Sequence, residues 1–230
     1  MDLSLLSDLN RIRSSRQAGI LITELSGGAQ RLVYGTDDFA SDPLADELAR
    51  RFRSGKSGRL ETDGGAVFLT VCVPPPRLVL IGAVHITQAL VPMAEVAGFD
   101  VLVIDPRTAF ATEERFPGTV LEAEWPEDVL KERPLDAYTA LAAVTHDPKI
   151  DDFPLQAALR AGCFYIGALG SRKTHAKRLE RFAEAGFGPE DVGRIDAPIG
   201  LDIGAASPAE IAVAVLGSVI SALRKGPEAA

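Results

Sequence analysis

The chain has 230 residues, 47% of them hydrophobic and 24% charged, which is enough to bury a core of ordinary domain size beside a smaller module. A formal net charge of −8 argues against the broad basic surface that non-specific nucleic-acid binding requires. The opening segment lacks the basic region of a signal peptide, and no apolar run reaches the roughly 20 residues that cross a bilayer, so we expect a cytoplasmic protein without membrane insertion.

The segment that ends at the proline run Pro74-Pro75-Pro76 predicts a small α+β module, residues 1–75. Leucines at helical spacing open it, and a hairpin follows around Ser26-Gly27-Gly28. Asp42-Pro43 then predicts a helix start with the aspartate as cap, and a second hairpin is expected around Gly64-Gly65. No residue of this module shows recognisable chemistry.

Residues 76–230 alternate apolar strand-like runs with helix-period segments. This alternation predicts an α/β fold with a Rossmann-like parallel sheet and crossover helices, in which ligands bind beyond the carboxyl ends of the strands. The predicted strands are 77–82, 100–105, 119–122, 137–144 and 163–167. Four of the loops that follow them hold unusual polar residues.

The first loop, Gly82-Ala83-Val84-His85, joins a strand to a helix in a βαβ unit of nucleotide-binding type. N–H groups at such a helix start attract an anion, and Asp105, which ends the second strand, could accept hydrogen bonds from ribose hydroxyls. Val84 stands where the dinucleotide fingerprint has its second glycine, which weakens the case for plain NAD binding. His85 fits a cap or a packing residue as well as a functional one.

The second and third loops place charged groups at two further strand ends. Arg107 follows two residues after Asp105, so a guanidinium suited to a phosphate stands near an acid suited to hydroxyls. In Thr145-His146-Asp147 an imidazole lies beside a carboxylate, and this pair could be acid–base machinery, metal ligands or a hydrogen bond within the loop. Because no second histidine lies nearby, we predict no metal site.

The fourth loop contains Gly167, Gly170, Ser171, Arg172 and Lys173 and leads into a basic helix. Ser171 is the expected N-cap, which puts both cations in the first turn, where the helix dipole disfavours positive charge. Either an anion binds there, or the cations form an ordinary solvated helix face.

The last apolar segment, Ile211 to Leu223, predicts a buried helix. Ser207 should cap this helix, with Pro208 at the first position and Glu210 closing a capping box. The glycines of the preceding segment, Pro198 to Gly204, let the backbone turn close to a ligand or to this helix.

Four segments resemble a known family: GAVHITQALVPMAEVAGFDVLVIDPR, VTHDPKIDDFPLQAAL, YIGALGSRKTHAKRLERFAEAGF and IDAPIGLDIGAASPAEIAVAVLGSVIS. In this order and spacing they strongly resemble the XdhC/CoxI family, over about residues 77 to 224. The resemblance implies an accessory protein that binds the molybdenum cofactor, as molybdopterin or its dinucleotide form, and protects it during sulfuration by a cysteine desulfurase. It also implies transfer to the apoenzyme of a molybdenum hydroxylase of the xanthine dehydrogenase or CO dehydrogenase type.

We therefore expect the cofactor to contact all four loops, and we assign no catalytic residue. The candidate binding residues are Gly82, Ala83, Val84, His85, Asp105, Arg107, His146, Asp147, Gly167, Gly170, Ser171, Arg172 and Lys173.

Two other functions stay open from the residues alone. One is an NAD(P)-dependent oxidoreductase with His146 as the acid–base residue, and the other is a scaffold whose nucleotide pocket has decayed. The apolar C-terminal helix and the N-terminal module could pack within the chain or form the face of a homodimer.

Overall fold

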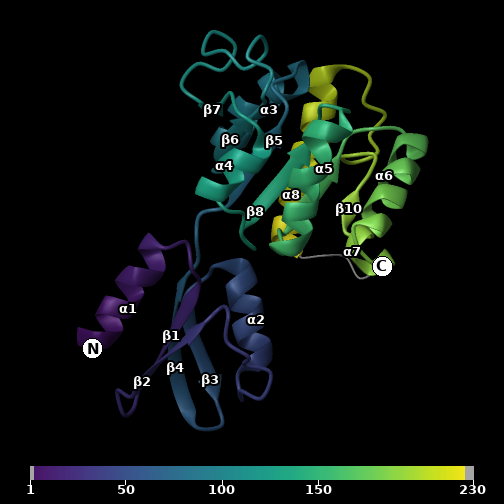
Figure 1. Cartoon of the computed structure of the whole chain (residues 1–230). Coiled ribbons are helices and arrows are strands. Elements are labelled where there is room, and N and C mark those ends of the chain that lie inside the picture. The colour runs from purple at the N-terminus through teal and green to yellow at the C-terminus, as the bar shows by residue number, and fades with distance from the viewer. Residues whose placement is uncertain (1–2, 226–230) are drawn as a thin grey trace. The chain divides into compact units, whose positions relative to one another are not determined.

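The computed structural model describes residues 3–225, which form two compact units that divide between Pro74 and Pro75. Each unit contains its own sheet, and the two sheets share no strand (Figure 1). Every helix within the described residues is too short or too polar to cross a bilayer.

The first unit is a four-stranded antiparallel sheet with strand order β2-β1-β4-β3 and two helices. The two hairpins follow the prediction, and the second one turns at Asp63-Gly64, a dipeptide favoured in two-residue hairpin loops. The elements are α1 (Leu3–Ser14), β1 (Gly19–Glu24), β2 (Gln30–Tyr34), α2 (Ala45–Ser54), β3 (Gly58–Thr62) and β4 (Gly65–Cys72).

The predicted cap of α2 is wrong. The helix begins at Ala45, and Leu44 occupies the cap position without a side-chain hydrogen bond. The Asp42 carboxylate instead accepts a hydrogen bond from the Leu44 N–H at 2.9 Å and pairs with Arg31 at 2.6 Å. Because the Arg31 guanidinium and the turn use this carboxylate, the helix starts later than the sequence pattern indicated.

The second unit has six parallel strands and six helices within the described residues. Its strands are β5 (Arg77–Ile81), β6 (Asp100–Ile104), β7 (Val120–Glu122), β8 (Thr139–Ala143), β9 (Tyr165–Ala168) and β10 (Ile195–Asp196). Its helices are α3 (His85–Val96), α4 (Pro126–Glu132), α5 (Pro148–Arg160), α6 (Arg172–Glu184), α7 (Pro189–Val192) and α8 (Pro208–Lys225).

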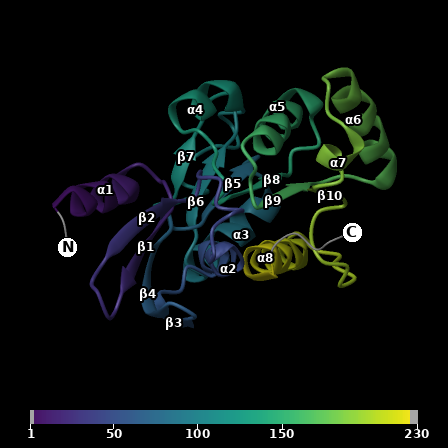
Figure 2. The same ribbon diagram turned by 90° about the horizontal axis from the view of Figure 1, so that it is seen from below.

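The strand order of this sheet is β10-β9-β8-β5-β6-β7, so the chain starts in the middle, runs to one edge and then returns to build the other half. This is the doubly wound Rossmann order, and its switch point lies between β5 and β8. Helices α3 and α8 cover one face of the sheet, and α4, α5 and α6 lie on the other side (Figure 2). The predicted Rossmann-like fold is confirmed.

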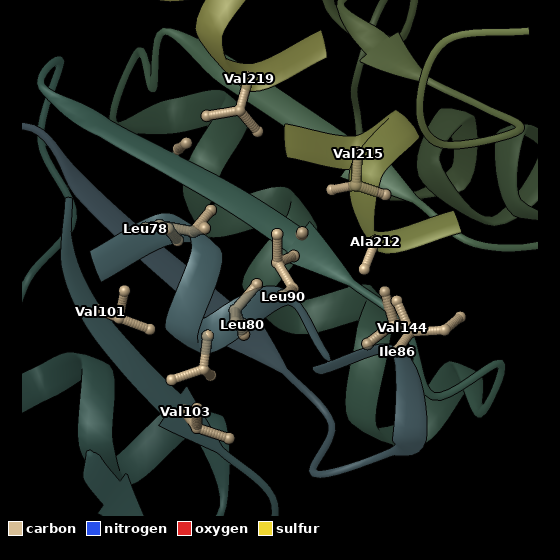
Figure 3. Close-up of a cluster of buried hydrophobic side chains, with 14 of the residues drawn as sticks. Leu78, Leu80, Ile86, Leu90, Val101, Val103, Val144, Ala212, Val215 and Val219 are labelled. Carbon is tan, nitrogen blue, oxygen red and sulfur yellow. The ribbon is translucent and has the colours of Figure 1, made fainter. Parts of the chain in front are cut away.

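Strand β5 contributes side chains to the hydrophobic clusters on both faces of the sheet. Its residues alternate in side-chain direction, so Leu78 and Leu80 join the cluster under α3 and α8, whereas Val79 and Ile81 join the cluster under α4 and α5. All four side chains are fully buried, as a central parallel strand requires. Figure 3 shows the first cluster, in which Leu80 lies among side chains of β6 and α3.

The C-terminal segment differs from the prediction in two respects. Strand β10 was not predicted, and α8 is buried on one face only: Val215 and Val219 are fully covered, but Val213 is 51% exposed. One glycine of the segment 198–204, Gly200, is required by packing, since a Cβ there would lie 2.9 Å from the Val215 nitrogen. This glycine serves the close approach of the loop to α8.

The capping box of α8 is confirmed. The Ser207 hydroxyl accepts a hydrogen bond from the Glu210 N–H, and the Glu210 carboxylate accepts bonds from the N–H groups of Ser207 and Ala206. These bonds satisfy N–H groups that the first helical turn leaves without a partner.

Candidate functional site

The ends of four neighbouring strands bring the four loops together at one edge of the second sheet. The backbone ladder continues past the strands, with Gly82 donating to Ile104, Val144 donating to Ile81 and Leu169 donating to Ala143. The first and third loops touch at the switch point, because a Cβ on Gly82 would lie only 2.6 Å from Thr145 Cγ2. Gly82 also has φ of +113°, a conformation that favours glycine.

The first loop leaves the N-terminus of α3 without a side-chain cap. Val84 occupies the cap position with no side-chain hydrogen bond, and the first turn contains no acidic residue. The free N–H groups and the helix dipole therefore favour an anion. The Val84 side chain is half-buried and packs against the core cluster, whereas His85 is exposed.

Asp105 does not present a free carboxylate. It is fully buried, and its Oδ2 accepts hydrogen bonds from the Ala83 N–H at 2.7 Å and from Arg107 Nη2 at 2.7 Å. Its Oδ1 accepts from the Arg107 backbone N–H and from Arg107 Nε, both at 2.9 Å. Burial alone would raise the pKa of Asp105, but these hydrogen bonds outweigh it and hold the pKa below its usual value. The acid that we expected to bind hydroxyls thus fixes the first loop to Arg107.

Arg107 of the second loop stays partly exposed beside its partner Asp105. Its guanidinium stacks over the Phe110 ring, with 4.6 Å to the centroid, and its side chain stays 34% exposed. The hydrogen bonds that it donates to Asp105 raise the pKa of Arg107, burial opposes this, and Asp105, Asp147 and Asp151 add attraction. The third loop therefore lies within electrostatic range of this cation.

Arg115, which no sequence motif pointed to, holds the other side of the first loop. Its Nη1 donates to the carbonyl groups of Ala83 and Phe110, both at 2.8 Å, and its Nη2 donates to Gln88 at 2.7 Å. Ala83 is thus held through its N–H by Asp105 and through its carbonyl by Arg115. Hydrogen bonds therefore hold the first loop from both sides.

In the third loop, His146 and Asp147 lie in different environments. His146 is exposed and adopts φ of +65°, a left-handed conformation that is uncommon for residues other than glycine. Asp147 caps α5, and its Oδ1 accepts a hydrogen bond from the Lys149 N–H at 3.0 Å. Within residues 3–225 no group of three or more metal-ligand side chains converges.

The fourth loop places its residues in two settings. Gly167 lies inside β9, where a Cβ would approach Ile199 to 2.6 Å, so it serves packing. Gly170 has φ of +141°, and Ser171 caps α6 as predicted, accepting a hydrogen bond from the Thr174 N–H at 3.2 Å. Arg172 and Lys173 are exposed in the first turn, which contains no acidic residue.

Sequence reasoning also missed a buried polar cluster, which we define as Asp151 of α5 with His175 and Arg178 of α6. Asp151 is fully buried, Arg178 is 2% exposed and His175 is half-buried. A detectable signal for Arg178 is its spacing four residues before Phe182, which places it on the apolar face of α6. The Asp151 carboxylate accepts a hydrogen bond from Thr145 at 2.7 Å, so the cluster begins at the third loop.

The family model described as XdhC Rossmann domain matches residues 78–219, which is more than half of the chain and includes all four loops. A solved structure from Bacillus halodurans, described as a xanthine dehydrogenase, superposes with a TM-score of 0.61 and covers 100% of this chain and 67% of that one. Its sequence identity of 23% supports a shared fold.

Three curated relatives also match. Uncharacterized protein YqeB of Escherichia coli (strain K12) is 33% identical over 77% of this chain and 33% of its own length. A probable xanthine dehydrogenase subunit of Bacillus subtilis (strain 168) is 32% identical over 69% of this chain and 46% of its own. Molybdenum cofactor insertion chaperone PaoD of Escherichia coli (strain K12) is 29% identical over 93% of this chain and 58% of its own. The chain therefore spans between a third and three fifths of these relatives.

Proposed function

The chain belongs to the XdhC family, and we propose on that basis that it binds the molybdenum cofactor and assists its insertion into a molybdenum hydroxylase. The relative named as a molybdenum cofactor insertion chaperone aligns with 93% of this chain, which supports the proposal. In this role the protein shields the cofactor while a cysteine desulfurase sulfurates it, and then delivers it to the apoenzyme. No catalytic turnover by this chain is required.

The observation that carries the proposal is the arrangement at the switch point, where an uncapped helix N-terminus lies next to a partly exposed guanidinium. The cofactor contains a phosphate, or a diphosphate in its dinucleotide form. The uncapped N-terminus of α3 and the half-exposed Arg107, which Asp105 holds in place, fit one such group. Arg172 and Lys173 supply two further exposed cations at the fourth loop. These residues would orient the bound cofactor through its phosphate end.

The same geometry counts against an NAD(P)-dependent oxidoreductase. Binding of a nicotinamide dinucleotide at this fold uses an acidic side chain on the ribose hydroxyls. Both Asp105 oxygens are already engaged by Ala83 and Arg107, and Val84 fills the place of the second fingerprint glycine. We therefore rank cofactor chaperoning above hydride transfer.

Equilibrium binding tests the proposal directly. Freshly released molybdenum cofactor is titrated into the purified chain under anaerobic conditions, with NADH and NADPH as competitors. We expect binding in the micromolar range or tighter that the nicotinamides do not displace. Binding of the nicotinamides without the cofactor would replace this function by the oxidoreductase, and binding of neither would favour a scaffold.

A charge-matched pair of variants localises the site. Arg172→Gln with Lys173→Gln should weaken cofactor binding severalfold, because two cations near a phosphate are lost while the fold is unchanged. Arg53→Gln with Lys56→Gln removes two cations from the surface of the first unit and should leave the affinity unchanged. Equal effects of the two double variants would mean that only net charge matters.

A further inference from the structure

The buried polar cluster of Asp151, His175 and Arg178 holds four polar atoms without a hydrogen-bond partner among the described residues. They are Asp151 Oδ2, His175 Nδ1, and Arg178 Nε and Nη1. The remaining Arg178 nitrogen, Nη2, donates to the Leu169 carbonyl at 3.3 Å. The ion pair of Arg178 with Asp152 is long at 3.9 Å, because Asp152 makes its close bidentate contact with Arg181.

Such a concentration of orphaned atoms is unusual, since buried polar groups in folded proteins nearly always have partners. A buried guanidinium and a buried carboxyl group are costly when some of their polar atoms have no partner, so these four atoms are candidates for contact with a bound group. The cluster begins at Thr145 of the third loop and reaches Leu169 of the fourth, at the edge of the sheet where ligands bind. This position at the carboxyl ends of the strands favours a role of the cluster in ligand binding over a purely structural one.

We propose that Asp151 and Arg178 together recognise the 2-amino-4-oxo pyrimidine edge that pterin and guanine rings share. This inference rests on the proposed function and deepens it, because it assigns the ring system of the cofactor to a part of the site separate from the phosphate. Asp151 Oδ2 accepts from the amino or ring N–H groups, and Arg178 donates to the ring carbonyl oxygen.

The mixture of charges explains why a ring fits this cluster better than a phosphate does. Arg178 offers donors only, Asp151 offers an acceptor, and His175 can do either in its neutral form. Burial, followed by the nearby Arg178 charge, lowers the pKa of His175, so the imidazole is held neutral. A phosphate beside Arg178 would also face the Asp151 carboxyl, whereas a neutral ring with adjacent donors and acceptors pairs with both residues.

The ligand must displace part of the cover, because the four orphaned atoms are buried. The segments 145–147 and 169–171 contact the cluster through Thr145 and Leu169. Both contain a residue with positive φ, His146 at +65° and Gly170 at +141°. We expect these two loops to move when the ring enters.

Four small molecules that differ at one edge test the inference on the unmodified full chain. Pterin is compared with lumazine, in which a carbonyl replaces the 2-amino group, and guanosine is compared with inosine, which lacks that group. Binding is measured at neutral pH by equilibrium dialysis. We expect pterin or guanosine to bind at least about tenfold tighter than its analogue, since Asp151 loses a donor in the analogue. The stronger of the two shows which ring is preferred.

Variants then assign the preference to the cluster. Asp151→Asn should remove the discrimination between pterin and lumazine, because an amide presents a donor as well as an acceptor. Arg178→Lys should weaken binding of both rings by about tenfold while keeping the positive charge. The control, Arg53→Gln with Lys56→Gln on the surface of the first unit, should leave free-ring binding unchanged. Thermal unfolding of each variant separates lost binding from lost folding.

Equal affinity of the wild type for each pair of rings, or undiminished discrimination in the folded Asp151→Asn variant, would overturn the inference. If the chain binds the molybdenum cofactor but shows neither ring preference, the proposed function stands and this inference fails. Conversely, Asp151-dependent ring binding without cofactor binding supports the ring site and contradicts the proposed function.

Discussion

A single carboxylate, Asp105, decides how the ligand edge of the second unit is organised. In nucleotide-binding sheets an acid at this strand end contacts the ligand, but here both oxygens bind protein groups. The acid connects the N–H of Ala83 to the guanidinium of Arg107, and Arg115 holds the carbonyl of Ala83 from the other side. Asp105 is therefore a positioning residue for the cation that we propose meets a phosphate.

The pKa of Asp151 is raised, whereas that of Asp105 is lowered, and this difference gives a testable pH dependence. Burial raises its pKa to about 6 from an ordinary value of 3.8. The folded chain therefore holds this proton more tightly than the unfolded chain, so the contribution of Asp151 to stability falls as the pH rises from about 4 to about 6. Above that range the contribution is constant.

Asp151→Asn should accordingly gain stability relative to the wild type across this range, on the order of 2 to 3 kcal/mol. The measurement is the free energy of unfolding in urea at steps between about pH 4 and pH 8. Asp105→Asn is the contrasting variant, because the pKa of Asp105 is lowered, so its titration should lie below the ordinary range of an aspartate. Parallel stability profiles for wild type and Asp151→Asn would refute the buried titration.

At the level of single residues, the sequence predicted which loops hold polar side chains better than it predicted which partners those side chains bind. Arg107 and the cap Ser171 follow from strand ends and helix starts, which are local patterns. The contacts of Arg115 and Asp151 depend on how distant segments pack, and no local pattern contains that information. The binding roles of the thirteen candidate residues remain predictions.

At the level of elements, apolar runs predicted five of the six strands in the second sheet to within two residues at their ends. The exception, β10, has only two residues, Ile195 and Asp196, which is too short for periodicity to show. It is defined by parallel pairing with β9, together with the hydrogen bond from the Tyr165 hydroxyl to Asp196 at 2.7 Å. Such a strand exists only in its tertiary context.

Helices α5 and α6, which enclose the buried polar cluster, are joined by the pair Asp152 and Arg181. The carboxylate accepts from Arg181 Nε at 2.5 Å and from Nη2 at 3.0 Å, and the two side chains are 16% and 37% exposed. A double-mutant cycle with Asp152→Asn and Arg181→Gln should give a coupling of about 1 kcal/mol, reduced by solvent screening from that of a buried pair. The exposed pair Asp128 and Lys131 should show no measurable coupling, and equal values for both pairs would contradict a structural role for the first.

At the level of the whole chain, one segment is positively charged although the chain as a whole is negatively charged. The net charge is −8, but the segment 171–181 contains five cations and one glutamate. Arg178 is buried and Arg181 pairs with Asp152, so Arg172, Lys173 and Lys177 are the cations of this segment that face solvent. Their attraction for an anionic ligand should weaken with salt. These cations lie in the second unit, as do all four loops.

The separation of the chain into two units leads to the last prediction. Residues 75–225 contain their own six-stranded sheet with a buried cluster on each face, so this fragment should fold and unfold cooperatively in urea. Because all proposed ligand contacts lie within it, the fragment should bind the molybdenum cofactor within about threefold of the full chain. Residues 1–74, made separately, should not bind. A fragment that folds but has lost affinity would show that the first unit contributes directly to the cofactor site.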